Sequence, residues 1–192
     1  MTSSYSLIAH SFSDQGGDLD QFADLLDVQY LTIINFNGNA KMDLLVTRNN
    51  RTHIYEYSFF DSTFKDISGE LDVSFSYKYQ LGDFNGDGLT DFTEIFNGGF
   101  KLLYSTGKEF EVKTGPYQKA ETQFIDNPEE LVVANDLNSD GKTDLLRFYF
   151  TATREIEITP AFEKTIFTPE IHVYAYLSTG DVFVKKDITS LF

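Results

Sequence analysis

The stretch LGDFNGDGLTDFTEIF, residues 81–96, decides the fold, because the chain contains a close copy of it and a weaker one. The close copy is ANDLNSDGKTDLLRFY, residues 134–149, and the weaker copy is IINFNGNAKMDLLVTR, residues 33–48. Consecutive copies start about 50 residues apart, a period that is typical of repeat arrays and propellers. The chain is therefore interpreted as an internal repeat.

The resemblance between the repeats continues downstream of each copy. The second repeat ends in LLYSTGKEFEV, residues 102–112, and the third in AYLSTGDVFV, residues 175–184. The first repeat has the looser HIYEYSFFDSTFKDI, residues 53–67. The N-terminal YSLIAHSFSDQGGDLDQF, residues 5–22, resembles such a tail without a loop before it. It is interpreted as the end of a preceding repeat.

The periodicity within a repeat is that of β-strands. Val73, Phe75, Tyr77 and Tyr79 alternate with polar residues, which predicts a strand. Turn signals such as Asn97-Gly98-Gly99 separate further short apolar runs, so about four strands are expected per repeat, the content of a propeller blade. The one candidate helix is residues 18–26.

These patterns predict an all-β chain made of one repeat domain, residues 1–192, with about three full four-stranded repeats and a partial N-terminal one. The expected parts are a partial blade or closing strands at 1–27 and blades at 28–70, 71–125 and 126–192. Closure as a small propeller, membership of a larger propeller and closure by oligomerisation all remain open. The third repeat carries an insertion at 151–170, expected to form a projecting hairpin or a long loop. It either builds a binding face or is a neutral length variation.

Composition and charge exclude several functional classes. The 192 residues carry a net charge of −15, which repels nucleic acid and anionic lipid headgroups and attracts cations. With no cysteine, the chain has neither disulfides nor thiolate chemistry. The N-terminus does not resemble a signal peptide, and no stretch approaches the roughly 18 apolar residues of a membrane helix.

Oxygen-bearing residues recur at every second position in the two full copies, which suits calcium. Calcium prefers about six to eight hard oxygen ligands from carboxylates, amides, main-chain carbonyls and water. A glycine at position six allows the sharp turn that wraps such a loop around an ion. The alternative is a turn in which Asp and Asn satisfy their own backbone. The expected ligands are Asp83, Asn85, Asp87, the Leu89 carbonyl and Asp91 in loop two, and Asp136, Asn138, Asp140, the Lys142 carbonyl and Asp144 in loop three.

The first copy is a degenerate version of the same loop. It has three Asn residues in place of acidic or mixed ligands, and Ala40 replaces the glycine. A single carboxylate attracts a dication weakly, so calcium is expected to be weak or absent here. The positions of this degenerate metal loop are Asn35, Asn37, Asn39, Lys41 and Asp43.

Loop two also fits the EF-hand spacing, because Glu94 stands at position twelve. An EF-hand needs a helix on each side. The flanks SFSYKYQL and TEIFNGGFKLLY are strand-like, and position twelve of loop three is Arg147, so the EF-hand interpretation is rejected.

DFNGDGLTD and DLNSDGKTD, each followed by an apolar strand and a Ser-Thr-Gly-x-x-Phe tail, resemble the FG-GAP/VCBS repeats over roughly residues 28–192. The resemblance implies blades of a β-propeller with a calcium loop between the first two strands of each blade. Similar loops occur in integrin α-subunit propellers and in the repeat regions of bacterial toxin complexes. The resemblance therefore implies about two calcium ions and the ligand sets named above.

No catalytic motif is evident. His10, His53 and His172 are isolated, and Glu129-Glu130 or Glu155 with Glu157 are the only candidates for paired carboxylates.

The leading hypothesis is a non-catalytic, calcium-stiffened module that binds a protein or a glycan or acts as a scaffold. The alternatives are a structural segment of a bacterial toxin complex and a glycan-acting enzyme with its site on blade loops. Tyr104, Tyr117 and Tyr174 are candidate sugar-stacking residues, although core or cross-strand packing is the preferred explanation for each of them. An extracellular or cell-surface setting is expected, because loops with so few carboxylates often bind calcium in the extracellular range.

Overall fold

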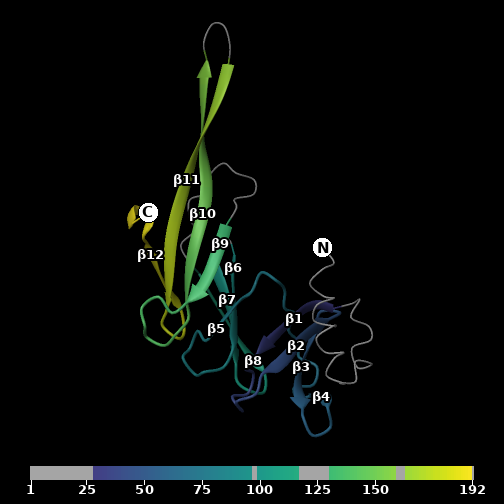
Figure 1. Cartoon of the computed structure of the whole chain (residues 1–192). Coiled ribbons are helices and arrows are strands. Elements are labelled where there is room, and N and C mark those ends of the chain that lie inside the picture. Colours follow the sequence, from purple (N-terminus) through teal and green to yellow (C-terminus); the bar gives the residue numbers. More distant parts are fainter. Residues whose placement is uncertain (1–27, 97–98, 117–129, 159–162, 192) are drawn as a thin grey trace. The chain divides into compact units, whose positions relative to one another are not determined.

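The computed structural model describes residues 28–96, 99–116, 130–158 and 163–191. The prediction of an all-β chain is confirmed: these residues form three four-stranded antiparallel sheets, none of which closes into a barrel or ring. The strands of each sheet are consecutive in sequence and adjacent in space, so every sheet is a meander (Figure 1). The expected N-terminal tail at 5–22 and helix at 18–26 lie outside the described residues.

Each repeat of the sequence forms one sheet. The first contains β1 (Val28–Ile34), β2 (Asp43–Arg48), β3 (Arg51–Ser58) and β4 (Thr63–Asp66). The second contains β5 (Gln80–Gly82), β6 (Asp91–Phe96), β7 (Gly99–Ser105) and β8 (Phe110–Pro116). The third contains β9 (Glu130–Asn135), β10 (Asp144–Ile158), β11 (Glu163–Ser178) and β12 (Phe183–Asp187), and a short 3-10 turn, η3 (Thr189–Leu191), follows it.

The Asp/Asn/Gly loops join the first two strands of each sheet. In all three cases the last Asp of the loop is the first residue of the second strand: Asp43 begins β2, Asp91 begins β6 and Asp144 begins β10. The apolar runs after these residues are the buried central strands, as their sequence predicts. Of the described residues, none forms a helix long and apolar enough to cross a membrane.

The chain divides into two compact units, Met1–Tyr77 with Ser105–Phe110, and Lys78–Tyr104 with Glu111–Phe192. The first unit buries Leu44 and Val46 on one face of its sheet, with Leu31 and Tyr55 against them. On the other face an aromatic chain runs from Tyr30 through Phe75 and Phe110 to Phe36, with ring centroids 5.1–6.4 Å apart. Aromatic pairs at these distances attract each other in addition to the apolar surface that they bury, so the chain of rings stabilises the unit.

The strand predicted from the alternation at Val73–Tyr79 is wrong. Of this run only Phe75 and Tyr79 are buried, Tyr77 is exposed, and the regular strand begins at Gln80. A strand requires a neighbouring backbone as well as an alternating sequence, and in this part of the described chain only Leu71 forms an isolated bridge, to Thr52.

The second unit is centred on the packing of the second sheet against the third. Its core cluster contains Phe84, Phe100, Leu102 and Tyr104 from the second repeat and Leu145 and Tyr176 from the third. Phe183 completes the cluster, with its ring edge-on to Phe84, Phe100 and Tyr176 at 5.3–6.5 Å. The two repeats of this unit therefore share one hydrophobic core.

The insertion at 151–170 forms the far part of the β10–β11 hairpin, the first of the two expected alternatives. β9 pairs only with Asp144–Tyr149 and β12 only with Tyr174–Ser178, whereas β10 and β11 continue to pair with each other as far as Ile158 and Glu163. Figure 1 shows this ribbon projecting beyond the ends of β9 and β12.

Candidate functional site

The three loops follow the same backbone course. Each has a left-handed residue at position four and another at position six, where the chain reverses twice within a few residues. Glycine takes this conformation without steric cost, which explains four of these six residues, whereas Ala40 and Ser139 adopt it with a side chain. The residues and their φ angles are Gly38 (72°) and Ala40 (64°), Gly86 (83°) and Gly88 (84°), and Ser139 (62°) and Gly141 (81°).

In loop two the backbone wraps around the first carboxylate. Asp83 Oδ1 accepts the N–H groups of Gly86 (2.6 Å) and Asp87 (3.1 Å), and Asp83 Oδ2 accepts that of Gly88 (2.8 Å). Asn85 Oδ1 accepts from the Asp87 N–H, and Asp87 Oδ1 accepts from the Leu89 N–H. Each oxygen at positions one, three and five is therefore oriented by a backbone donor two to five residues ahead.

Loop three repeats this network position by position. Asp136 Oδ1 accepts from Ser139 (2.7 Å) and Asp140 (3.2 Å), and its Oδ2 accepts from Gly141 (3.0 Å). Asn138 Oδ1 accepts from the Asp140 N–H, and Asp140 Oδ1 accepts from the Lys142 N–H, as Asn85 and Asp87 do in loop two. Because the two loops differ at positions two, four and seven, the network depends on the shared Asp, Asn and Gly residues.

The last Asp of each loop is a buried structural residue. Asp43, Asp91 and Asp144 are all nearly inaccessible to solvent. One carboxylate oxygen of each accepts the N–H of the residue at position two, namely Phe36, Phe84 and Leu137, in every case at 3.0 Å. This bond closes the loop, whether or not the second oxygen has a further ligand.

Loop one keeps the backbone course but replaces the charges. Asn35, Asn37 and Asn39 accept the same kind of forward N–H bonds through neutral amide oxygens. Glu56 on β3 takes a hydrogen bond from the Asn39 side chain and an ion pair from Lys41 Nζ, the latter at 2.5 Å. The ammonium group of Lys41, a residue of the loop, is thus paired with the carboxylate of Glu56.

The carboxylates of the loops differ in how readily they ionise. The N–H groups around Asp136, that of Gly141 first, lower its pKa, so this group is an anion over an extended acidic range. Burial raises the pKa of Asp43, and the Phe36 N–H offsets only part of that effect. Hydrogen bonds from Lys41 and Asn39 lower the pKa of Glu56.

A serine from a Ser-Thr-Gly tail contacts each of the first two loops, a role that the sequence analysis did not assign. Within the first unit, Ser105 Oγ donates to the Phe36 carbonyl (2.7 Å), and within the second, Ser178 Oγ donates to the Phe84 carbonyl (2.6 Å). A Cβ on Gly107 would lie 3.4 Å from Asn37 Cα, so the tail approaches the loop closely. The repeated Ser-Thr-Gly was the available signal, but its partner lies in another repeat.

Loops two and three are joined directly. The Thr143 N–H donates to the Asp83 carbonyl (2.7 Å), and the Asp83 N–H donates to Thr143 Oγ1 (2.9 Å). A Cβ on Gly86 would lie 3.4 Å from Lys142 Cγ, so the stem of Lys142 extends over loop two. Lys142 Nζ also lies 3.7 Å from Asp140 Oδ2, a partly exposed pair of small energetic value.

The oxygen ligands expected in loops two and three are of the chemical kind that a hard cation binds. Every expected ligand is a carboxylate, an amide oxygen or a main-chain carbonyl, and an oxygen that accepts one N–H retains a lone pair for a metal. Among the described residues, no three or more His, Asp or Glu side chains converge as a metal cage. An ion here would therefore depend on the Asn85 and Asn138 amides and on the Leu89 and Lys142 carbonyls as well.

The other candidate residues do not form an evident site. Tyr104 is buried and donates to the Gly180 carbonyl, and Lys185 Nζ lies 3.7 Å from the ring centroid of Tyr174, so packing accounts for both. His53 is hydrogen-bonded to Asp66 (2.7 Å), and His172 contacts Thr151. Tyr117, Glu129 and His10 lie outside the described residues.

Comparisons with known proteins add no assignment. No protein-family model matches the chain, and no curated protein is significantly similar to it.

Proposed function

We propose that this chain is a non-catalytic calcium-binding β-repeat module that holds one ion in loop 83–91 and another in loop 136–144. The observation that carries the proposal is the duplicated network around Asp83 and Asp136. Two loops that differ in sequence orient the same oxygens with the same backbone donors. The ligands would be those expected from the sequence, which are the hard oxygens that calcium prefers.

Local charge supports the proposal. The chain has a net charge of −15, and loops two and three each contain three Asp residues within nine positions. An ion would neutralise this repulsion and stabilise the native state by mass action, because the unfolded chain does not hold the ligands together. In loop one the Lys41 ammonium already lies beside Glu56, so we propose that loop 35–43 is held without metal.

The architecture would be that of FG-GAP/VCBS-like propeller blades. Each meander of four strands has its loop between the first two strands, which is the blade arrangement that the sequence resemblance implies. The role that fits such a module is recognition of a protein or glycan, or a scaffold, in a secreted or surface protein. The alternative role, a structural segment of a toxin complex, would use the same module within a larger chain.

The test is a calorimetric calcium titration combined with thermal unfolding in calcium and in EDTA. We expect about two ions per chain and, at a free calcium concentration 100 times Kd, a stabilisation of about 2.7 kcal/mol per site. Asp87→Ala and Asp140→Ala should each remove one ion. Asn39→Ala, at the same position of loop one, is the matched control and should leave the stoichiometry at two.

No binding heat and no difference between calcium and EDTA would overturn the proposal. The loops would then be Asx turns that are satisfied by their own hydrogen bonds. An unchanged stoichiometry in both Asp87→Ala and Asp140→Ala would place the sites elsewhere in the chain.

A further inference from the structure

The two faces of the third sheet are covered to different extents. The inner face carries Leu145 and Tyr176, which are paired in the β10–β11 register and buried in the core shared with the second sheet. The outer face, on the alternate residues, is also apolar; Val173 and Ala175 on it are buried, but other apolar side chains on the same face are open to solvent. Its exposed side chains, with 39–65% of their surface accessible, are Leu131, Val133, Phe150, Ile156, Phe167, Ile171 and Val184.

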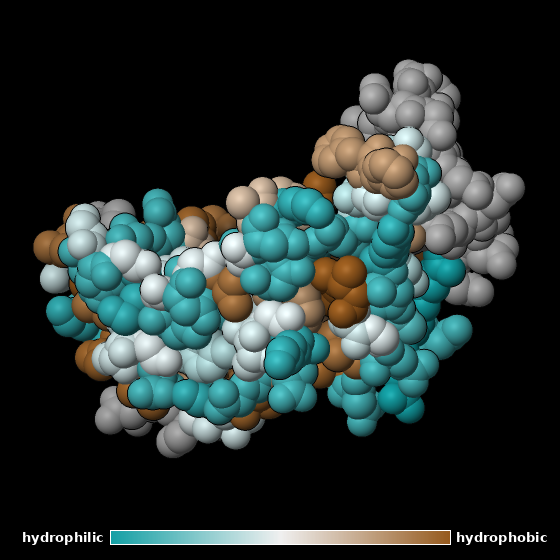
Figure 2. All heavy atoms as spheres, turned by 90° about the horizontal axis from the view of Figure 1, so that it is seen from below, coloured by the Kyte–Doolittle hydropathy of each residue, from teal (hydrophilic) through white to brown (hydrophobic). Residues whose placement is uncertain are grey.

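At the register position of the pair Leu146 and Ala175, of which Ala175 is 6% exposed, the corresponding face of the other two sheets is fully buried. In the first sheet this face contains the paired Leu45 and Ile54, and in the second it contains the paired Thr93 and Leu102, all at 0% exposure. Scattered apolar groups are normal on a surface, and Figure 2 shows them among hydrophilic side chains. Seven exposed apolar side chains on one face of one sheet are more than such scattered groups, and exposed apolar surface of this kind favours an interaction site.

The loop of the third repeat is uncovered in the same way. Phe36 and Phe84, at position two of loops one and two, have 0% exposure, and their carbonyls accept the Ser105 and Ser178 hydroxyls. Leu137 occupies this position in loop three and is 42% exposed. In the part of the chain that the structure describes, no serine hydroxyl binds the Leu137 carbonyl.

The first repeat has a tail turn that covers no loop within the described residues. Ser58 pairs with Thr63 across the β3–β4 turn, as Ser178 pairs with Phe183 across the β11–β12 turn, so Ser58 is the positional equivalent of Ser178. Its hydroxyl donates to the Asp61 carboxylate (3.2 Å). Phe59 and Phe60 in this turn are 83% and 98% exposed.

We infer that the outer face of the third sheet, with loop 136–144, binds the Ser58–Thr63 turn of a second copy of this chain. The chain contains this interaction between a tail turn and a loop twice. The proposed contact would form it a third time, between two molecules. The exposed Phe59 and Phe60 would pack on the apolar face, with Ser58 near the Leu137 carbonyl. Since the two surfaces differ, the association is head-to-tail.

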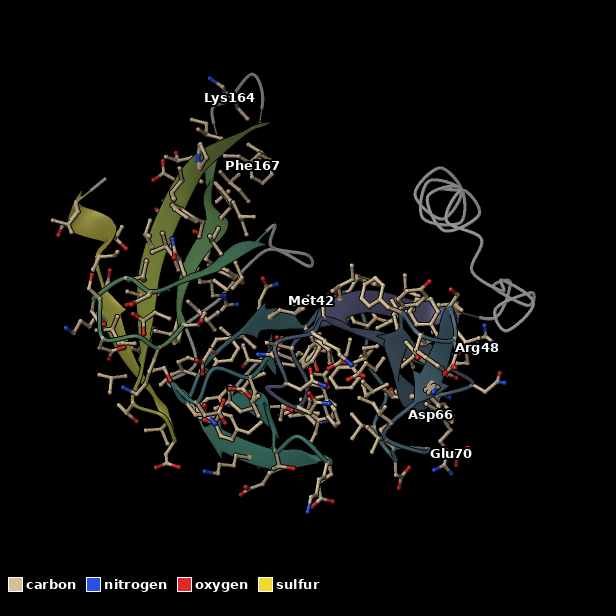
Figure 3. All side chains as sticks on the ribbon, turned by 60° about the horizontal axis from the view of Figure 1, so that its bottom comes forward. Met42, Arg48, Asp66, Glu70, Lys164 and Phe167 are labelled. Atoms are coloured by element: carbon tan, nitrogen blue, oxygen red, sulfur yellow. The ribbon has the colours of Figure 1, made fainter. Side chains whose placement is uncertain are left out.

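Phe167 illustrates the energetic reason. It lies near the far end of the β10–β11 ribbon (Figure 3), where two strands have no further strand beside them. A two-stranded ribbon is marginally stable alone in water, and covering its apolar face stabilises it. The net charge of −15 per copy opposes the association, so salt should strengthen it by screening.

The test is sedimentation velocity over about 5 to 500 µM chain, a range that spans dissociation constants from micromolar to hundreds of micromolar. We expect the mass to rise with concentration and with salt. Val184→Glu on the outer face and Phe60→Ser in the turn should each return the chain to a monomer. Val112→Glu on β8 is the matched control, because Val112 is 48% exposed and Val184 47%, and it should associate like the parent.

Mixing the two defective variants tests the head-to-tail geometry. Val184→Glu retains an intact turn and Phe60→Ser an intact face, so an equimolar mixture should form a 1:1 dimer and nothing larger. A parent chain that stays monomeric at every concentration would overturn the inference, as would a mixture that stays monomeric. The measurement is made with calcium and with EDTA, so that a failure of the proposed metal sites is distinguished from a failure of this contact.

Discussion

Ala40 is the residue at which the backbone energy of loop one differs most clearly from that of loops two and three. It has a φ of 64° at the position where Gly88 and Gly141 have 84° and 81°. A side chain in the left-handed region costs roughly 1–2 kcal/mol, because Cβ crowds the following carbonyl oxygen. The first loop therefore keeps its course against a local penalty, supported by the Asn side chains and the Asp43 carboxylate.

Ala40→Gly should raise the free energy of unfolding by about 0.5–1 kcal/mol, since relief of strain exceeds the added entropy of the unfolded chain. Gly141→Ala is the converse change at 81°, with open space around the new Cβ, so its cost is conformational and its sign is opposite. Urea denaturation of both variants in EDTA would measure the effect. Equal signs for the two changes would contradict the explanation.

Asp66 is a second residue whose environment gives a testable consequence. Burial by itself would raise its pKa, but hydrogen bonds from His53, Gly69 and Ser68 outweigh that effect, and the pKa of Asp66 is lowered. A carboxyl whose pKa is lower in the folded state contributes stability above its unfolded pKa of about 3.9, and that contribution is lost as the pH falls through the folded value.

Asp66→Asn should therefore be less stable than the parent at neutral pH, and the gap in melting temperature should narrow as the pH falls below about 4. The comparison between the two proteins cancels the other carboxyl groups that titrate in the same range. Thermal scans from neutral pH to the lowest pH at which the fold persists provide the measurement. A gap that stays constant with pH would mean that the charge of Asp66 has no role.

At the scale of elements, the β10–β11 hairpin consists of two parts that differ in their neighbouring strands. Its base, Asp144–Tyr149 with Tyr174–Ser178, has a strand on each side, and its far part pairs only with itself. The base contributes Leu145 and Tyr176 to the shared core, whereas the far part buries no large apolar side chain among the residues described.

Removal of residues 151–170, with an Asn-Gly turn joining Phe150 to Ile171, should leave the fold intact. These two residues are register partners, and Asn-Gly closes a two-residue hairpin in the required twist. The melting temperature should change by only a few degrees, as expected for loss of about 1 kcal/mol or less. Circular dichroism and the calcium titration would check this, and loss of the fold would show that the ribbon is needed for core formation.

At the scale of the whole molecule, the repeats are tied together by single side chains that join distant positions. Ser178 Oγ binds the Phe84 carbonyl although 94 residues separate them, and the Ser178 N–H donates to Asp144 Oδ1. Both groups are buried, so the loop of the second repeat depends on the third repeat for satisfaction of its main chain.

Ser178→Ala should destabilise the chain by about 1–3 kcal/mol, because it leaves the Phe84 carbonyl buried without its donor. If loop 83–91 holds calcium, the same change should weaken the ion in that loop and leave loop 136–144 nearly unaffected. Thr179→Ala, which alters an exposed hydrogen bond of the same turn, is the control. Equal effects of the two changes on stability would contradict the argument.

Sequence by itself determined the number and position of the loops, the all-β class and the strand that follows each loop. These features depend on local chemistry: left-handed glycines, carboxylates that bind their own backbone, and apolar runs. Tertiary structure alone decided that Val73–Tyr79 is not a strand, that Ser105 and Ser178 bind loops in other repeats, and that several apolar side chains on one face of the third sheet are exposed. Burial, pairing and exposure depend on neighbours far away in the chain, and a residue pattern does not record which neighbour is present.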